Sequence, residues 1–307
     1  MSDQPAGSSS SGHTQRCGYV AIVGRPNVGK STLLNFILGM KLSITSRKPQ
    51  TTRHQILGVK TSGETQAIYV DTPGIHQRRG TAINKYMNRA ATSILKDVDV
   101  ILFVMQAKQW TEEDQAIVEK LKSVSCPVLL IVNKMDKLDS KKELLPIIEE
   151  LSSKFDFSEI IPVSALNGVN IEVLEQKLSP LLPENAPFYP EDQVTDRSMR
   201  FLTSEIIREK LIRELGQELP SSSTVNIEKY DEDEKIVRIH ATIYVESNGQ
   251  KSIIIGKKGA RLKSIGTKAR EDISAMVGSK VYLNLWVKVR EGWSNDERAL
   301  RGLGYSE

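Results

Sequence analysis

The sequence has little cysteine, little net charge and no long apolar run. Its 307 residues include only two cysteines, Cys17 and Cys126. Two thiols cannot form a disulfide framework or a cysteine-rich metal site, and because each stands beside an apolar run, we expect both to be buried and reduced. No apolar run approaches the length needed to cross a bilayer. The net charge is only +4, so any affinity for nucleic acid must come from a local patch.

The chain is long enough for two domains, and 39% hydrophobic with 26% charged residues is a globular composition. Residues 1–15 are rich in Ser and Gly and lack an apolar stretch, so we expect a disordered tail rather than a signal peptide. Four prolines crowd the region around residues 182–196, which predicts a semi-rigid linker. The linker divides the chain into a first domain, 16–181, and a second domain, 197–307.

A phosphate-binding loop stands near the start of the first domain. Residues 24–31 read G-x-x-x-x-G-K-S, between an apolar strand at 19–23 and a helix at 32–38. Glycines at two positions let the backbone N–H groups point at phosphate oxygens. Lys30 is expected to reach the β- and γ-phosphates and Ser31 to bind Mg²⁺. The residues predicted to hold the nucleotide here are Gly24, Arg25, Pro26, Asn27, Val28, Gly29, Lys30, Ser31 and Thr32.

Two later segments are expected to complete the metal site. The polar, basic stretch 41–53 contains a proline and predicts a mobile loop, in which Thr52, with Thr51 as the alternative, would join Mg²⁺ when the γ-phosphate is present. Strands at 55–61 and 65–70 form a hairpin that delivers Asp71-Thr72-Pro73-Gly74. Asp71 would hold Mg²⁺ through water, and the Gly74 N–H would bind a γ-phosphate oxygen. The predicted metal residues are therefore Ser31, Thr52 and Asp71, and the catalytic ones Lys30, Thr52 and Gly74.

Two further motifs point to guanine. An apolar strand at 128–132 ends in Asn133-Lys134-Met135-Asp136. The Asp136 carboxylate can accept from both N1–H and the 2-amino group of guanine, whereas adenine would leave this acceptor unpaired at a cost of several kcal/mol. Asn133 and Lys134 would brace the base and the loop. A strand at 159–163 leads to Ser164-Ala165-Leu166, where the Ala165 N–H is expected to bond guanine O6.

The four motifs follow in order, each at the carboxyl end of a predicted strand, where open α/β sheets bind ligands. They predict that the first domain is an α/β P-loop GTPase domain with a mostly parallel sheet. Ile75 stands where Ras-like proteins have the glutamine that orients the attacking water, so intrinsic hydrolysis should be slow. Similar GTPases with an asparagine at the position of Asn27 use K⁺ there. Whether Asn27 binds K⁺ or only holds the loop stays open.

The second domain has the pattern of an RNA-binding fold. A helix from about residue 201, strands at 224–230 and 236–245, two helices and a strand at 280–289 give the order α–β–β–α–α–β. This α+β order, with a G-x-x-G loop between the last two helices, predicts a type II KH domain, whose loop clamps single-stranded RNA. Residues 247–290 carry ten basic side chains against two acidic ones. The predicted RNA-binding residues are Ile254, Ile255, Gly256, Lys257, Lys258, Gly259, Arg261 and Lys263.

A short helix beginning at Ser294 is expected to end the second domain, with Trp293 packed in the core rather than stacked on a base.

The chain resembles the Era family of bacterial GTPases over nearly its whole length after about residue 16. The matching stretches are Gln50-Thr51-Thr52-Arg53, Asp71-Thr72-Pro73-Gly74, Thr195-Asp196-Arg197-Ser198, Ile254-Ile255-Gly256-Lys257-Lys258-Gly259, Trp286-Val287-Lys288-Val289 and Asp296-Glu297-Arg298-Ala299-Leu300. The resemblance implies binding of 16S rRNA near its 3′ end and a role, on a pre-30S particle, in maturing the small (30S) ribosomal subunit. It also implies a cytoplasmic protein with peripheral contact to the inner membrane. Nothing in the sequence demands more than a monomer.

These observations predict a switch. GTP and Mg²⁺ would order residues near 41–55 and 72–90 and open the KH groove to RNA, and hydrolysis would release the particle. Two alternatives stay open: an RNA-binding module whose GTPase domain does not switch, and a membrane-linked signalling GTPase. The first predicts that Asp136→Asn leaves RNA binding unchanged. The second predicts liposome binding that survives mutation of Lys257 and Lys258 to Asp.

Overall fold

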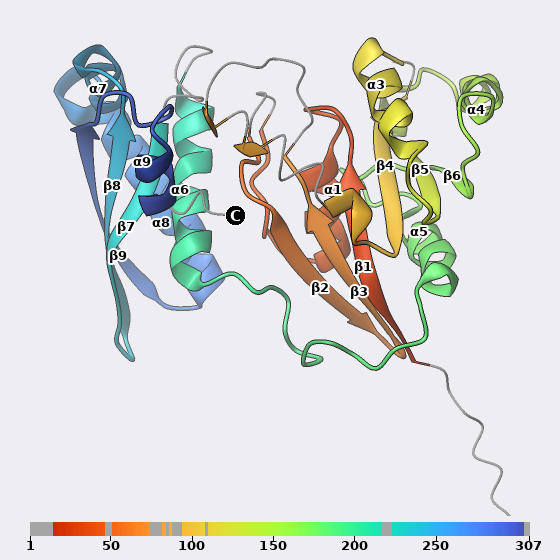
Figure 1. Cartoon of the computed structure of the whole chain (residues 1–307). Helices are drawn as coiled ribbons and strands as arrows, with labels where there is room; N and C mark the ends of the chain where they lie inside the picture. Colours follow the sequence, from red (N-terminus) through yellow and green to blue (C-terminus); the bar gives the residue numbers. More distant parts are fainter. Residues whose placement is uncertain are drawn as a thin grey trace, which may run out of the picture.

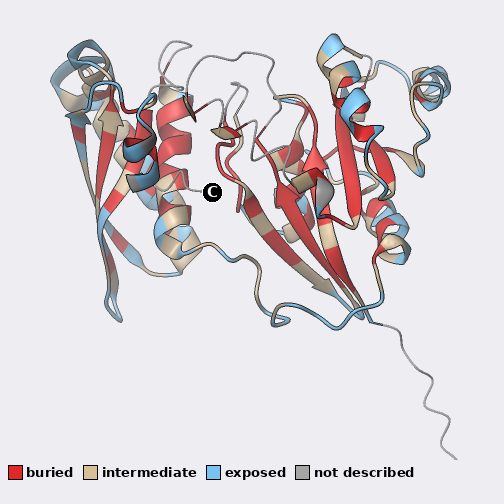
Figure 2. Ribbon diagram, viewed as in Figure 1, coloured by how far each residue is buried: buried red, intermediate tan, exposed pale blue. Residues whose placement is uncertain are grey.

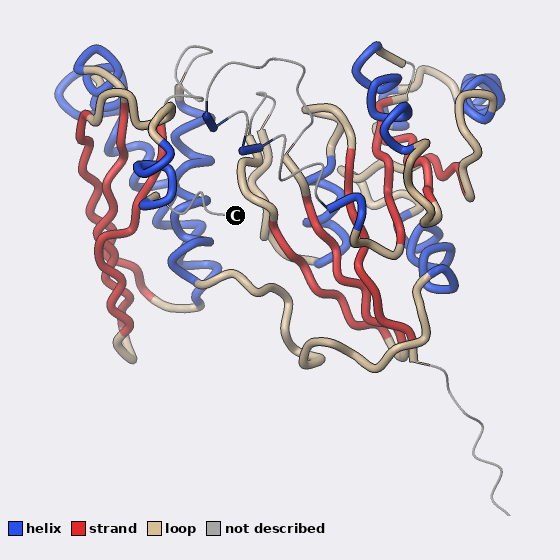
Figure 3. The backbone as a smooth tube through the Cα atoms, viewed as in Figure 1, coloured by secondary structure: helices blue, strands red, loops and turns tan. Residues whose placement is uncertain are grey.

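Two domains lie side by side in the computed structural model, joined by an extended segment along one end of the larger one (Figure 1). The structure describes residues 15–46, 51–73, 82–83, 86–87, 94–107, 110–215 and 223–303. Within this part of the chain, every helix is too short or too polar to cross a bilayer. Figure 3 shows the same view coloured by secondary structure, with strands at the centre of the first domain and at the outer side of the second.

The first domain is built on a six-stranded sheet with the order β2-β3-β1-β4-β5-β6. β2 pairs with β3 in antiparallel register, as expected for a hairpin, and all the other pairs are parallel. The fold is therefore an α/β arrangement with a mostly parallel sheet, as predicted. The strands are β1 (Arg16–Val23), β2 (Ile56–Ser62), β3 (Thr65–Asp71), β4 (Val100–Gln106), β5 (Val128–Asn133) and β6 (Glu159–Pro162).

Helices cover both faces of this sheet, so its central strands are buried throughout (Figure 2). Neighbouring strand residues such as Ile22 and Val23 belong to two different hydrophobic clusters, one on each face. α1 (Lys30–Leu38) and α5 (Ile171–Leu178) pack on one face, and α3 (Glu112–Leu121) and α4 (Leu144–Ser152) on the other. Short 3-10 turns lie at Ile94–Lys96, Met135–Lys137, Lys141–Glu143 and Ser179–Leu181.

The proline-rich segment between the domains is held against the first one. The Gln66 carboxamide accepts from the backbone N–H groups of Phe188 and Tyr189 at 2.8 and 3.0 Å. Further along, the Val59 N–H donates to the Val194 carbonyl at 2.8 Å. These bonds lie along the β2–β3 hairpin, so the linker has a defined path that brings the second domain next to residues 41–46 and 51–57.

The second domain has the predicted order α–β–β–α–α–β, which is the type II KH arrangement. β7 (Ser223–Glu232) pairs with β8 (Ile236–Val245) in antiparallel register, and β8 pairs with β9 (Lys280–Val289) in parallel. α6 (Met199–Glu214) and α8 (Ala260–Val277) pack on one face of this sheet around a single hydrophobic cluster. α7 (Asn248–Ile255) leads through the 3-10 turn Lys257–Gly259 into α8, and α9 (Glu297–Gly302) ends the described chain.

Three expectations differ from the structure. Cys17 is buried as expected. Cys126, which lies between α3 and β5, is only partly buried. The last helix begins at Glu297 rather than Ser294, because the Asp296 side chain accepts from the Arg298 N–H and caps it there. Trp293 is fully buried, but in a small cluster that includes Ile83 of the first domain rather than in the KH core.

Candidate functional site

In the loop between β1 and α1, the backbone conformation at Gly24 and Gly29 is one that favours glycine. Gly24 has a φ of 152° and Gly29 a φ of 107°, and a Cβ on Gly24 would lie 2.3 Å from the Val104 carbonyl oxygen. Lys30 folds back over the loop, and its Nζ donates to the carbonyl oxygens of Gly24 at 2.9 Å and Arg25 at 3.1 Å. Burial lowers the pKa of Lys30 to about 8, although the nearby Asp71 carboxylate opposes this.

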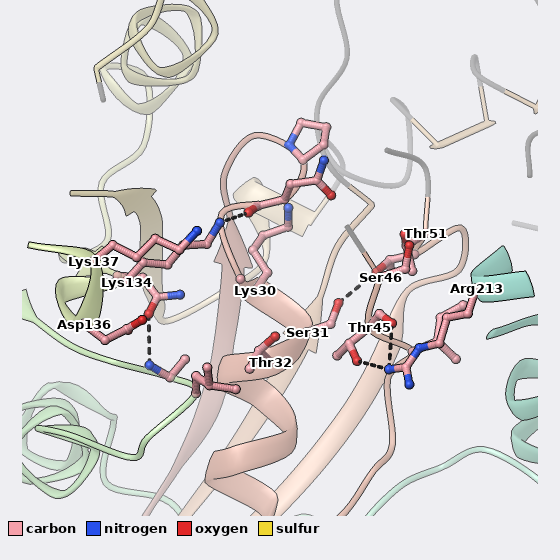
Figure 4. Close-up of a pocket in the computed structure, with 18 residues that line it drawn as sticks. Lys30, Ser31, Thr32, Thr45, Ser46, Thr51, Lys134, Asp136, Lys137 and Arg213 are labelled. Carbon is pink, nitrogen blue, oxygen red and sulfur yellow. Dashed lines mark hydrogen bonds between the residues drawn. The ribbon is translucent and has the colours of Figure 1, made fainter. Parts of the chain in front are cut away.

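A pocket of about 830 Å³ opens above this loop. Figure 4 shows that its walls come from distant parts of the chain, including Arg213 from the second domain. Twelve predicted site residues line it, and these are Pro26, Asn27, Gly29, Lys30, Ser31, Thr32, Thr52, Asn133, Lys134, Asp136, Ala165 and Leu166. Thr51, the alternative to Thr52, also lines it, as do five residues that the sequence did not predict, Ile44, Thr45, Ser46, Lys137 and Arg213.

Among the three predicted metal residues, Ser31 lies within hydrogen-bonding distance of the other two. The Ser31 hydroxyl donates to Asp71 Oδ2 at 2.8 Å and lies 2.9 Å from Thr52 Oγ1. Ser43, which the sequence did not predict, also donates to Asp71 Oδ2 at 2.8 Å. The other carboxylate oxygen, Asp71 Oδ1, is buried and has no hydrogen-bond partner in the described part of the chain.

This donor set fits Mg²⁺. Two hydroxyls and one carboxylate with a free oxygen are hard ligands, and Mg²⁺ is normally held by one or two carboxylates together with substrate phosphates and water. Burial raises the pKa of Asp71, against the opposing effects of Lys30 and the Ser31 and Ser43 hydroxyls, and a bound cation would offset the cost of the buried charge. Ser31, Thr52 and Asp71 are therefore the residues that would hold the ion.

The opposite end of the pocket is braced through Asn133. Its Nδ2 donates to the Val28 carbonyl at 2.8 Å and its Oδ1 accepts from the Ala165 N–H at 3.0 Å. The sequence assigned the Ala165 N–H to guanine O6, and in this structure it donates to Asn133. Lys134 donates to the Asn27 carbonyl at 2.5 Å, and Asp136 Oδ1 accepts from the Ser164 hydroxyl at 2.5 Å. The carboxylate of Asp136 is thus fixed at the pocket wall.

The remaining predicted nucleotide residues lie behind the pocket or outside the described chain. Arg25 pairs with the buried Asp114 at 3.1 Å, which ties the phosphate loop to α3. Val28 is buried, and the Thr72 hydroxyl donates to the Ile22 carbonyl at 2.9 Å, so both support the loops. Pro73 is the last described residue of its segment, and Gly74 lies outside the described residues.

A second groove, of about 510 Å³, lies between α8 and the edge strand β9. Of the predicted RNA-binding residues, Gly259 and Lys263 line it. Ile254 is fully buried in the domain core, and Arg261 donates to the Ile253 carbonyl at 2.5 Å, so these two support the loop from behind. The groove residues that the sequence did not predict are Leu262, Gly266, Thr267, Arg270, Val281, Tyr282, Leu283 and Leu285.

The backbone of the G-x-x-G loop explains its residue types. Gly256 and Gly259 have φ values of 71° and 78°, and Lys258 between them also has a positive φ of 51°. A Cβ on Gly256 would lie 2.8 Å from the Arg261 Cβ. Lys257 and Lys258 are exposed, so a chain of phosphates can approach both the main chain and the two charges.

The first domain contacts the second through the segments that follow the phosphate loop and Asp71. Thr45 accepts a hydrogen bond from Arg213 at 3.2 Å, and the Thr51 carbonyl accepts one from Arg208 at 2.5 Å. The Ile83 N–H donates to the Ser294 carbonyl at 3.3 Å beside the buried Trp293. These contacts leave no local signal in the sequence, because they join residues more than 150 positions apart.

Comparison with known proteins gives matches over both domains. The model of the family described as 50S ribosome-binding GTPase matches residues 19–134, and that of the KH domain family matches residues 218–294. The chain is 58% identical over 305 residues to GTPase Era of Pseudomonas aeruginosa, which covers 99% of this chain and 98% of the relative. It is 61% identical over 290 residues to GTPase Era of Ectopseudomonas mendocina, with coverage of 94% and 97%.

Two solved structures are similar over nearly the whole chain. One is a variant of Aquifex aeolicus Era bound to GDP·AlF₄⁻, with a TM-score of 0.92 and 41% identity. The other is Era in complex with MgGDPNP and nucleotides 1506–1542 of 16S ribosomal RNA, with a TM-score of 0.92 and 42% identity. Each comparison covers 95% of this chain and 100% of the solved one.

Proposed function

The chain belongs to the Era family of GTPases, and from this premise we propose that it is a GTP-hydrolysing switch that binds RNA. In this proposal the first domain binds GTP or GDP with Mg²⁺ and converts GTP and water to GDP and phosphate. The KH domain binds 16S rRNA near its 3′ end, and the protein acts on the pre-30S particle in maturation of the small (30S) ribosomal subunit. The solved relative with MgGDPNP and 16S rRNA nucleotides supports both binding sites.

The observation that carries the switch is the position of Arg213. This residue belongs to α6 of the RNA-binding domain, yet it lines the nucleotide pocket and donates to both the carbonyl and the hydroxyl oxygen of Thr45 at 3.2 Å (Figure 4). A nucleotide in this pocket therefore lies next to a segment that is bonded to the RNA-binding domain. A GTPase domain that only supported its neighbour would not need such a contact at its ligand site.

The residues of the pocket account for phosphate binding. The glycine backbone at the start of α1 and the positive end of the helix would receive the phosphate oxygens, and the Lys30 ammonium would add a buried cation beside them. When bound, Mg²⁺ supplies charge that neutralises the phosphates. Since Ile75 cannot orient a water molecule, we expect slow hydrolysis in the absence of an activator.

Guanine selection would depend on Asp136, and exchanging it tests the proposal. Asp136→Asn keeps an oxygen that can accept from Ser164 but adds an N–H donor, which suits the 2-oxo group of xanthine instead of the 2-amino group of guanine. RNA binding by this variant should therefore respond to xanthosine nucleotides and no longer to guanosine nucleotides. The measurement is the affinity for an RNA copy of the 16S 3′ end with the diphosphate or a non-hydrolysable triphosphate analogue of each base.

Two results would contradict the proposal. If the variant still responds to guanosine nucleotides at wild-type concentrations, Asp136 does not select the base. If its RNA affinity equals that of the wild type and responds to no nucleotide in either protein, the domain does not act as a switch.

For location and assembly we propose a monomer in the cytoplasm with peripheral contact to the inner membrane, on the strength of the family resemblance alone. Co-sedimentation with anionic liposomes tests the membrane contact. Binding that survives mutation of Lys257 and Lys258 to Asp would favour the membrane-linked alternative, because such binding would not use the RNA-binding loop.

A further inference from the structure

A short segment of the first domain links the metal site to the second domain. Within residues 41–45 the middle residue, Ser43, is fully buried and donates to Asp71 Oδ2 at 2.8 Å. Lys41 and Thr45, two positions before and after Ser43, both contact the carboxylate of Glu209 on α6. Five consecutive residues therefore connect the carboxylate that would hold Mg²⁺ with a single carboxylate of the RNA-binding domain.

Glu209 is enclosed at this junction. Its side chain has no solvent exposure, and it pairs with Lys41 from the first domain and with Arg213 of its own helix at 2.8 Å. Both the N–H and the hydroxyl of Thr45 donate to Glu209 Oε1 at 3.4 Å. A buried carboxylate held by a backbone N–H and by cations from both domains has little freedom to adapt, so movement of residues 41–45 must change its surroundings.

Arg208, the preceding residue of α6, makes a parallel connection. It is 2% exposed and is paired to Glu205, and its Nη2 donates to the Thr51 carbonyl at 2.5 Å. Thr51 precedes Thr52, whose hydroxyl lies 2.9 Å from Ser31. The two neighbouring residues of α6 therefore hold Thr45 and Thr51, and Thr51 is adjacent to a predicted metal ligand.

The same helix is attached to the RNA groove. Lys210 of α6 pairs with Asp272 of α8 at 2.5 Å, and Lys41 of the first domain reaches the same carboxylate at 2.8 Å. Glu214 accepts from Ser264 of α8 at 3.0 Å and pairs with a lysine one turn further along. α8 also supplies one wall of the RNA groove, so a shift of α6 relative to α8 would alter that wall.

We infer that Arg208 and Glu209 are the positioning residues through which the KH domain senses the nucleotide. They contact Thr45 and Thr51, which lie next to Ser43 and Thr52 at the metal site, and through α8 they transmit a change in these contacts to the RNA groove. This inference rests on the proposed function, because it names the regulatory contact of the same switch.

The test measures how strongly nucleotide state controls RNA affinity. The quantity is the ratio of the two dissociation constants for the 16S 3′-end RNA, one with saturating GDP and one with a saturating GTP analogue. Linked sites typically change each other's affinity by about 5- to 150-fold, so the wild type is expected in this range. The variants are Glu209→Gln, which removes the charge at constant shape, and Thr45→Val, which removes one hydroxyl from the other side of the same contact.

Both variants should bring the ratio below about twofold, well under the range for linked sites. Glu119→Gln is the matched control, because Glu119 pairs with Lys122 on the exposed surface of α3, and it should keep the wild-type ratio. A ratio that stays at the wild-type value in a folded Glu209→Gln protein overturns the inference. If that variant does not fold, Thr45→Val decides in the same way.

The failure of the inference can be separated from failure of the proposed function. If the wild type itself shows no nucleotide dependence, the switch is wrong, and with it the inference. If the wild type and Glu119→Gln show the dependence and both contact variants keep it, the switch stands and only the role of Arg208 and Glu209 is wrong.

Discussion

The amide nitrogen of Asn133 occupies the space that a side chain on Gly29 would need. A Cβ atom at Gly29 would lie 2.2 Å from Asn133 Nδ2, and that nitrogen is fixed by its bond to the Val28 carbonyl. The first and third nucleotide motifs are therefore in direct contact, and the loop that binds phosphate is shaped by the segment that selects the base.

Gly29→Ala should abolish nucleotide binding, because the methyl group displaces Asn133 and forces a residue other than glycine to a φ of 107°. The matched control is Gly39→Ala, which also has a positive φ, of 65°, but where a Cβ meets nothing within 4 Å. The control should lose only about 1–2 kcal/mol of stability and still bind nucleotide. Titration with fluorescent GDP measures the nucleotide affinity of the two variants. Equal affinity would contradict the prediction.

Trp293→Ala should loosen the contact between the C-terminal segment and residues 82–83 and 86. Trp293 is fully buried beside Ile83 and Leu300, and truncation of a buried tryptophan costs about 3–5 kcal/mol. Urea unfolding measures the loss. Trp286→Ala is the control, since Trp286 is 55% exposed on β9, and it should change stability far less. Equal losses in the two variants would show that Trp293 does not join the domains.

Replacing Asn27 by glycine separates a role in K⁺ binding from one in holding the loop. Asn27 has a φ of 64°, which glycine adopts without strain, so Asn27→Gly keeps the backbone and removes only the carboxamide. If K⁺ binds there, GTP turnover by the wild type should be faster in KCl than in NaCl, and the variant should lose the difference. Equal turnover of the wild type in both salts would exclude the K⁺ site.

The salt dependence of RNA binding tests the lysines of the G-x-x-G loop. If Lys257 and Lys258 each contact a phosphate, replacing either by glutamine should reduce the slope of log K against log salt by about 0.7 for a single strand. Lys288→Gln is the control, because Lys288 pairs with Glu228 at 3.0 Å on the sheet rather than in the groove. An unchanged slope for both loop variants would remove the loop from the RNA site.

Much of the fold follows from local patterns. The apolar runs at 19–23 and 128–132 predicted β1 and β5 to within a few residues, because a strand buried on both faces is mostly apolar. The G-x-x-G loop and the phosphate loop could be placed because their glycines have conformations that few other residues adopt. No local pattern separates Thr52 from its alternative Thr51, and the structure places the Thr52 hydroxyl 2.9 Å from that of Ser31.

The contacts between the domains could not be predicted in this way. Ile207 and Leu211 recur at helical spacing in α6 and are buried, but this spacing gives no reason to bury Glu209 or Arg208 on the same helix. Their burial depends on Lys41, Thr45 and Thr51, which only the folded chain brings near. The role of Ser43 was missed for the same reason, since a serine in a polar loop carries no local sign that it will reach Asp71.

Binding of an RNA copy of the 16S 3′ end in the two nucleotide states tests the central claim most directly. Wild-type protein is saturated with GDP or with a non-hydrolysable GTP analogue, at one fixed salt concentration because phosphate contacts depend on salt. A scrambled RNA is the control. We predict tight, sequence-selective binding with the analogue and clearly weaker binding with GDP. Equal affinity in both states would contradict the switch, although it would leave the KH domain as an RNA-binding module.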